Sequence, residues 1–78
     1  MQWRPVIETR PDPEAGDWVN TSSSFDGGDS GVMSRAPTRE LAEELARTAA
    51  KNDRAEHIVF DESGAELHRT TYTDWPRL

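Results

Sequence analysis

Two histidines on either side of the last predicted turn are the strongest candidates for metal chemistry in this sequence. If the final hairpin closes through a two-residue tip, His57 and His68 lie directly opposite each other and share a face with Glu66. Two imidazoles and a carboxylate are ligands that zinc accepts, although three ligands on a flat sheet hold it weakly. If Gly64 forms a one-residue bulge instead, the pairing shifts and the histidines separate. We therefore predict no cofactor, and we keep a weak metal-binding domain as a further alternative.

A glycine-rich segment offers a second kind of chemistry. Gly28-Asp29-Ser30-Gly31 reproduces the four residues around the nucleophile of trypsin-like serine proteases. Those enzymes need two β-barrels to align serine, histidine and aspartate, and 78 residues do not supply them. Asp26, Asp29 and Ser30 could also bind a hard cation such as calcium, but their spacing fits no known calcium loop. We interpret the segment as a flexible loop, and we predict that the protein is not an enzyme.

The charge balance says more about partners. The chain has 15 acidic and 9 basic residues and a net charge of −6. The clustered Lys and Arg that bind a nucleic-acid backbone or an anionic membrane are absent, so we expect neither as a direct partner. The acidic residues fall on the predicted strands and turns. The candidates for binding a protein partner are Asp12, Glu14, Asp17, Asp26, Asp29, Asp61 and Glu62.

Such an acidic surface has two functional interpretations. It can attract a basic or nucleic-acid-binding protein and raise the rate of association. It can also imitate a phosphate backbone and block a host or defence protein, as small phage-encoded inhibitors do. Acidity can equally serve solubility or reflect the source organism, since 8 of the 9 basic residues are arginine. We take the protein-interaction module as the leading hypothesis and the nucleic-acid mimic as the alternative.

Composition limits the class of protein. There is no cysteine, which excludes disulfides and cysteine-ligated metals. The longest apolar run is Ile58-Val59-Phe60, too short for a membrane span or a secretory signal, so we expect a cytoplasmic protein. Hydrophobic residues make up 33 % of the chain, which is little for a core in so short a domain. A second subunit often compensates for this deficit, so we expect a homodimer.

The elements that must position these residues follow from periodicity and turn signals. Thr38 is an N-cap, and the segment from Arg39 to about Asn52 has an apolar face of leucine and alanine. Pro5 predicts that the first strand lies at a sheet edge or carries its proline at its start. The predicted strands are 3–10, 18–25, 32–36, 55–60 and 65–73, with turns at 11–17 and 61–64 and an irregular tail at 74–78.

These elements predict one α+β domain over residues 1–78. A single antiparallel sheet of four or five strands carries one amphipathic helix, about 38–52, on one face. The exposed sheet face or an edge strand would then serve as the association surface. The predicted core consists of Ile7, Trp18, Leu41, Ala42, Leu45, Ala49, Ile58, Phe60 and Leu67.

The same residues carry a resemblance. Trp3-x-x-Val6, Gly16-Asp17-Trp18-Val19 and the helix start Thr38-Arg39-Glu40 resemble a small bacterial domain family of unknown function. Ala55-Glu56-His57-Ile58-Val59, leading through a Ser63-Gly64 turn to Tyr72, is similar to the final hairpin of that family. The resemblance covers most of the chain. It implies the same order of strands and helix, and it implies no catalytic role.

Overall fold

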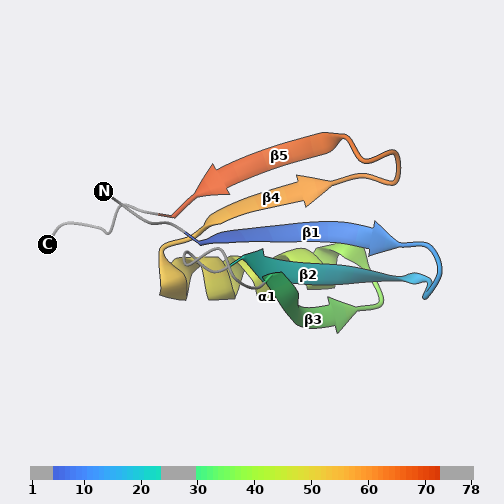
Figure 1. The fold of residues 1–78 in the computed structure, drawn as a ribbon, viewed down its shortest axis with the longest axis horizontal. Helices are drawn as coiled ribbons and strands as arrows, with labels where there is room; N and C mark the ends of the chain where they lie inside the picture. Colours follow the sequence, from blue (N-terminus) through green and yellow to red (C-terminus); the bar gives the residue numbers. More distant parts are fainter. Residues whose placement is uncertain (1–4, 24–29, 73–78) are drawn as a thin grey trace, which may run out of the picture.

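The computed structural model, which describes residues 5–23 and 30–72, contains one five-stranded sheet with a helix against one face (Figure 1). The predicted α+β class is therefore confirmed. The elements are β1 (Val6–Asp12), β2 (Asp17–Ser23), β3 (Ser30–Ala36), α1 (Arg39–Asp53), β4 (Glu56–Phe60) and β5 (Glu66–Thr71). The predicted tail at 74–78 lies outside the described residues.

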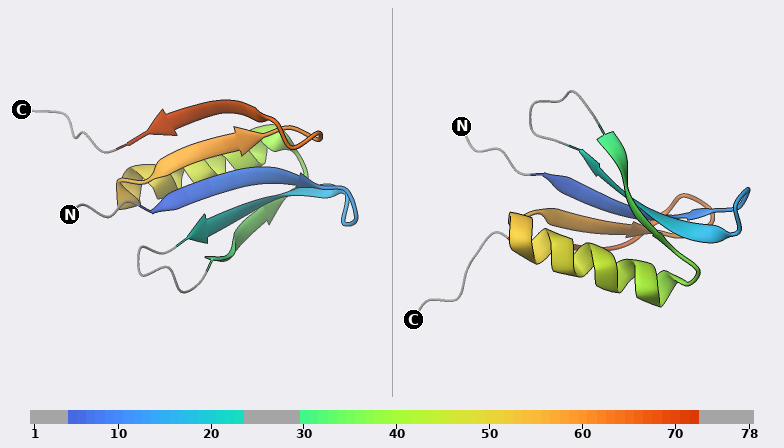
Figure 2. Two further views of the ribbon diagram at one scale, coloured as in Figure 1. Left: turned by 45° about the horizontal axis from the view of Figure 1, so that its top comes forward. Right: turned by 90° about the horizontal axis from the view of Figure 1, so that it is seen from below.

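The strands are ordered β3-β2-β1-β4-β5, and every neighbouring pair is antiparallel except β1 and β4. The connection through α1 explains this parallel pair. β3 ends at the same end of the sheet as β1, and α1 then runs back across one face, as Figure 2 shows. β4 therefore begins where β1 begins and runs beside it in the same direction.

Two prolines lie near the ends of the central strand β1, where a missing N–H is tolerated. Pro5 precedes the strand, and its carbonyl oxygen accepts the N–H of Glu56 at 3.0 Å, so the prediction of a proline at the strand start is confirmed. The strand continues to Asp12, beyond its predicted end. Pro11 pairs with Trp18, and the turn is therefore shorter than predicted, with Gly16 at a φ of 75°.

Helix α1 begins and ends at local signals. The hydroxyl of Thr38 accepts the N–H of Leu41 at 3.2 Å, which confirms the predicted N-cap. At the other end Arg54 adopts the left-handed conformation, and its N–H donates to the carbonyl of Ala50. Across the described ranges, no helix has the length and apolar character that crossing a membrane requires.

The core is built from smaller side chains than the sequence predicts. Ile7, Ala42 and Ile58 are buried as predicted. The prediction is wrong for Leu41, Leu45 and Leu67, which are 42–44 % exposed. Trp18, Ala49 and Phe60 are half-buried. The remaining buried apolar residues are Ala36, Ala46, Ala50, Ala55 and Val59.

The physical reason lies in the face that α1 turns to the sheet. Ala42, Ala46 and Ala50 follow each other at four-residue spacing and are completely buried. Ala46 and Ala50 of this alanine stripe pack against Ile7, and the leucines of the same helix lie away from the centre of the contact. Alanine lets the helix approach the sheet closely. In this structure the helix turns its alanines, rather than its larger leucine side chains, toward the sheet.

We expect Thr38→Ala to lower the free energy of unfolding by about 1 kcal/mol, because the N–H of Leu41 then loses its partner. Chemical denaturation followed by circular dichroism measures this. Thr48→Ala is the matched control, since its exposed hydroxyl bonds only the carbonyl of Glu44 one turn earlier. Equal losses in the two variants would contradict the capping role.

Candidate functional site

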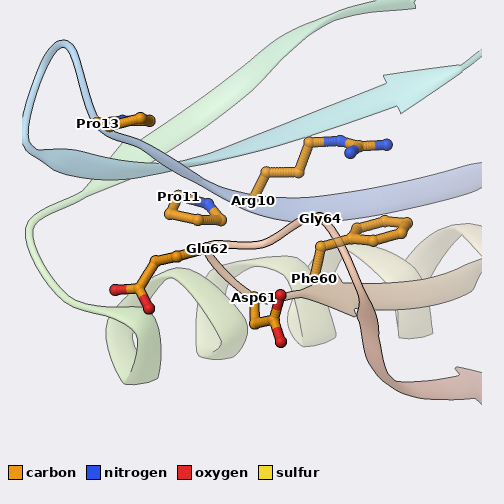
Figure 3. Close-up of a pocket in the computed structure, with 7 residues that line it drawn as sticks. All are labelled: Arg10, Pro11, Pro13, Phe60, Asp61, Glu62 and Gly64. Carbon is orange, nitrogen blue, oxygen red and sulfur yellow. The ribbon is translucent and has the colours of Figure 1, made fainter.

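The β1–β2 and β4–β5 turns lie at the same end of the sheet (Figure 1), and residues of both line a groove there (Figure 3). It consists of two adjoining cavities of about 220 and 200 Å³, which share Pro11, Pro13 and Glu62. We call it the hairpin-end groove. Its residues are Arg10, Pro11, Asp12, Pro13, Gly16, Asp17, Trp18, Phe60, Asp61, Glu62 and Gly64.

The lining of the groove is largely apolar. Pro11 and Pro13 come from the first hairpin, and Phe60 comes from the end of β4. The guanidinium carbon of Arg10 lies 4.1 Å from the centroid of the Phe60 ring (Figure 3), where a cation interacts favourably with the aromatic face. Arg10 also bonds Glu8 at 2.7 Å. These contacts give the groove a wall that a hydrophobic side chain can pack against.

Three of the carboxylates at this end have structural partners. Arg35 lies 3.0 Å from Asp12 and 2.9 Å from Asp17. The hydrogen bond from Arg35, with help from the N–H of Ala15, holds the pKa of Asp12 below its usual value. Asp61 accepts the hydroxyl of Ser63 at 2.6 Å and turn amides, which lowers its pKa in the same way. These groups hold the two turns in shape.

Two carboxylates remain. Those of Glu14 and Glu62 form no hydrogen bond or ion pair with another of the described residues, and both side chains are exposed. Five of the seven predicted partner-binding residues thus lie at this end, although two turns far apart in the sequence supply them. Asp26 and Asp29 lie outside the described residues, so the groove is defined without them.

Ion pairs cover the sheet face opposite α1, where three arginines bind five carboxylates. Arg69 bonds Glu56 at 3.1 Å and Glu66 at 2.9 Å. Together with the pairs of Arg10 and Arg35 described above, these bonds neutralise much of the acidity predicted for the strands. Exposed pairs of this kind stabilise the fold little, but they leave few free charges on this face.

The histidines meet in a different register from the one predicted. His57 pairs with Thr70, and His68 pairs with Val59, so the two histidines are diagonal rather than opposite. Two features cause the shift: the turn closes between Asp61 and Ala65 rather than around a two-residue tip, and a bulge lies between Val59 and Phe60 instead of at Gly64, where the alternative placed it. The two rings nevertheless share the helix-facing side, with centroids 6.5 Å apart.

The third candidate ligand does not join them. Glu66 pairs across with Phe60 and bonds Arg69, which places it on the opposite side of the sheet from the histidines. The residue near His68 is instead Glu43 of α1, at 3.6 Å. In the part of the chain that the structure describes, no three histidine, aspartate or glutamate side chains are arranged to hold a metal ion.

A buried chain of hydrogen bonds connects the sheet to the helix, and sequence reasoning missed it. Thr9 Oγ1 lies 2.6 Å from Asn20 Oδ1 and 2.8 Å from His57 Nε2. Asn20 Nδ2 donates to the main-chain carbonyl of Ala42 at 2.8 Å. Thr9 and Asn20 are completely buried and His57 is 3 % exposed. We call this set the buried polar chain.

The Ala42 carbonyl, at one end of the buried polar chain, determines which atom donates in each hydrogen bond. A carbonyl oxygen can only accept, so the amide nitrogen of Asn20 must face Ala42 and its oxygen must face Thr9. Thr9 has one hydroxyl proton and donates it to that oxygen. Thr9 Oγ1 must therefore accept from His57, so Nε2 carries the hydrogen. The other nitrogen, Nδ1, is where His57 would take up a proton.

This direction decides what the Thr9–His57 pair can do. A nucleophilic hydroxyl needs an imidazole that accepts its proton, whereas here the imidazole donates. Thr9 is also completely buried, so no substrate reaches it. The pair therefore serves the structure.

Of the protease-like motif, the structure describes Ser30 and Gly31. They belong to β3 and pair with Ser23 and Ser22, so these two residues form a strand rather than the predicted loop.

Comparisons with known protein-family models, with curated proteins and with solved structures find no match at the significance required. The resemblance to a small bacterial domain family therefore stays a prediction.

We expect Thr9→Val to lower the free energy of unfolding by about 2 kcal/mol, because it leaves the Asn20 oxygen and the His57 N–H buried without partners. Thr71→Val is the matched control, since Thr71 is an exposed strand residue. Urea denaturation of both variants measures the difference. A neutral effect of Thr9→Val would show that the buried polar chain contributes nothing to stability.

We also expect the protein to lose stability as the pH falls below about 6.5. Burial lowers the pKa of His57 most, the Glu43 carboxylate partly raises it, and His68 and Arg47 lower it further. The unfolded chain then binds a proton that the folded chain resists, so His57 stabilises the fold above its ordinary pKa of 6.5 and loses that effect as the pH falls.

Urea denaturation at a series of pH values between about 8 and 5 tests this. His57→Gln should flatten the decline in this range, whereas His68→Gln should retain it, because the His68 side chain is 52 % exposed. An unchanged decline in His57→Gln would assign the effect to another group.

Proposed function

We propose that this protein is a non-enzymatic interaction module that binds a basic segment of a partner protein in the hairpin-end groove. The observation that carries the proposal is an apolar groove that includes the free carboxylate of Glu62 and lies beside the exposed turn that carries Glu14. A segment that fits would place an apolar side chain against Pro11 and Phe60, and an arginine or lysine beside these glutamates.

The pattern of ion pairs favours this function over imitation of a nucleic acid. A phosphate mimic needs a run of free negative charges along its surface. Here Arg10, Arg35 and Arg69 bind carboxylates on the open sheet face and at its edge. The free acidity that supports binding is therefore local, and it coincides with apolar surface.

The side chains that line the groove include no hydroxyl or imidazole group, and this favours a binding role. Thr9 and His57 are buried, and the groove itself contains carboxylates, prolines and aromatic rings. Carboxylates catalyse proton transfer when burial separates their pKa values. Those of the groove lie at an exposed end of the sheet, and the pKa values of Asp12 and Asp61 are shifted downward by hydrogen bonds instead.

Selection from a random peptide library displayed on phage tests the proposal. We expect the retained peptides to share an arginine or lysine next to an apolar residue. Fluorescence anisotropy of a selected peptide should show weaker binding as the salt concentration rises, because screening weakens exposed charge pairs.

Glu14→Gln combined with Glu62→Gln should reduce the affinity of that peptide about tenfold, or about 1.4 kcal/mol. Glu40→Gln combined with Glu44→Gln is the matched control, since it removes the same charge from exposed positions of α1. Selection without basic residues, or an equal loss in the control, would overturn the proposal.

A further inference from the structure

The solvent side of α1 carries an unusual division of charge. Glu40 and Glu44 lie in the first half of the helix, and Arg47 and Lys51 lie in the second half. The spacing of four, three and four residues puts all four on one side. None of them forms a hydrogen bond or ion pair through its side chain with any other described residue. Glu43, which lies four residues before Arg47, bonds Arg39 instead.

Exposed apolar side chains lie next to this row of charges. Leu41 and Leu45 are 43 % and 42 % exposed, although the alanine stripe of the same helix is completely buried. Thr48 continues the line of the leucines by one turn and is exposed as well. Figure 2 shows the sheet on one side of α1 and no other described element on its opposite side.

We propose that α1 is a homodimer interface, in which the helices of two copies of this chain pack antiparallel about a two-fold axis. A two-fold contact requires a surface that is complementary to itself. In the antiparallel arrangement Glu40 of one copy meets Lys51 of the other, and Glu44 meets Arg47. Each half of the helix thereby finds the opposite charge on its partner.

The apolar residues follow the same symmetry. With these charges paired, the axis passes near the middle of α1, so Leu45 of each copy packs beside the middle of the partner helix and Leu41 beside its last turns. A helix of 15 residues is only about 22 Å long, so the contact is small and the dimer is weak. A parallel arrangement would set acidic residues against acidic ones, and it is disfavoured.

The proposal differs from the interaction with a basic segment, because it uses another surface. The hairpin-end groove lies at the two turns, whereas the four charged residues are exposed residues of α1. Failure of peptide binding therefore leaves the dimer untouched, and the reverse holds as well.

Exchanging the charges provides a sharp test. Glu40→Lys with Glu44→Lys makes the solvent side of α1 basic, and Arg47→Glu with Lys51→Glu makes it acidic. We expect the unmodified protein to dimerise in sedimentation equilibrium, and each double variant to associate at least tenfold more weakly. An equimolar mixture of the two variants should form a heterodimer, because every charge then meets its opposite.

Additional variants control for folding and for the apolar contact. Charge exchange opposes the helix dipole, so circular dichroism must first show that both variants are folded. If one is not, Glu44→Gln with Arg47→Gln removes the central pair without reversing any charge, and it should still weaken the dimer. Leu41→Ser with Leu45→Ser should abolish association, whereas Leu67→Ser, on the similarly exposed Leu67 of β5, should not.

Three results would overturn the proposal. The first is a monomer at the highest soluble concentration of the unmodified protein. The second is a dimer that the folded charge variants leave unchanged. The third is a mixture of folded basic and acidic variants that does not associate, since this would show that the charges serve only the helix dipole.

Discussion

The close contact between an alanine stripe and a five-stranded sheet is the constraint on which the structure depends. Because Ala42, Ala46 and Ala50 have small side chains, the backbone of α1 comes near enough for Asn20 to bond the Ala42 carbonyl directly, at 2.8 Å. A leucine at these positions would push the helix away and separate that pair. The chain is too small to bury many large apolar side chains. Close packing of the helix on the sheet and a buried hydrogen bond between them stabilise the fold instead.

Sequence reasoning succeeded where local signals decide the structure. The helix start at Thr38, the turn at Gly16 and the two hairpins depend on residues that are close together in the chain. The parallel pairing of β1 with β4 depends on the crossing of α1, and the prediction of an antiparallel sheet did not include it. The leucines were misplaced because a helical period identifies an apolar arc, and the arc alone does not show which edge of it meets the sheet.

The candidate sites show the same limit. A shift of two residues along β5 puts Thr70 rather than His68 opposite His57, and the sequence did not fix this register. Thr9 and Asn20 looked like ordinary polar strand residues, since their burial depends on a helix that arrives later in the chain. The sequence indicated the acidic residues of the two turns as candidates for partner binding, but their meeting around Pro11 and Phe60 is a consequence of the strand order.

The distribution of paired and free charges connects the fold to both proposals. Arginines on the open sheet face bind carboxylates of their own or neighbouring strands, so the carboxylates of these pairs are not free to bind a partner. Among the described residues, free charges gather at the hairpin-end groove and on the solvent side of α1. At the groove they have one sign, which suits a partner of opposite charge. On α1 they have both signs in two halves, which suits a copy of the same helix. Because the two surfaces are separate, a dimer formed through α1 would present two grooves, and a partner with two basic segments would bind it more tightly than either groove alone.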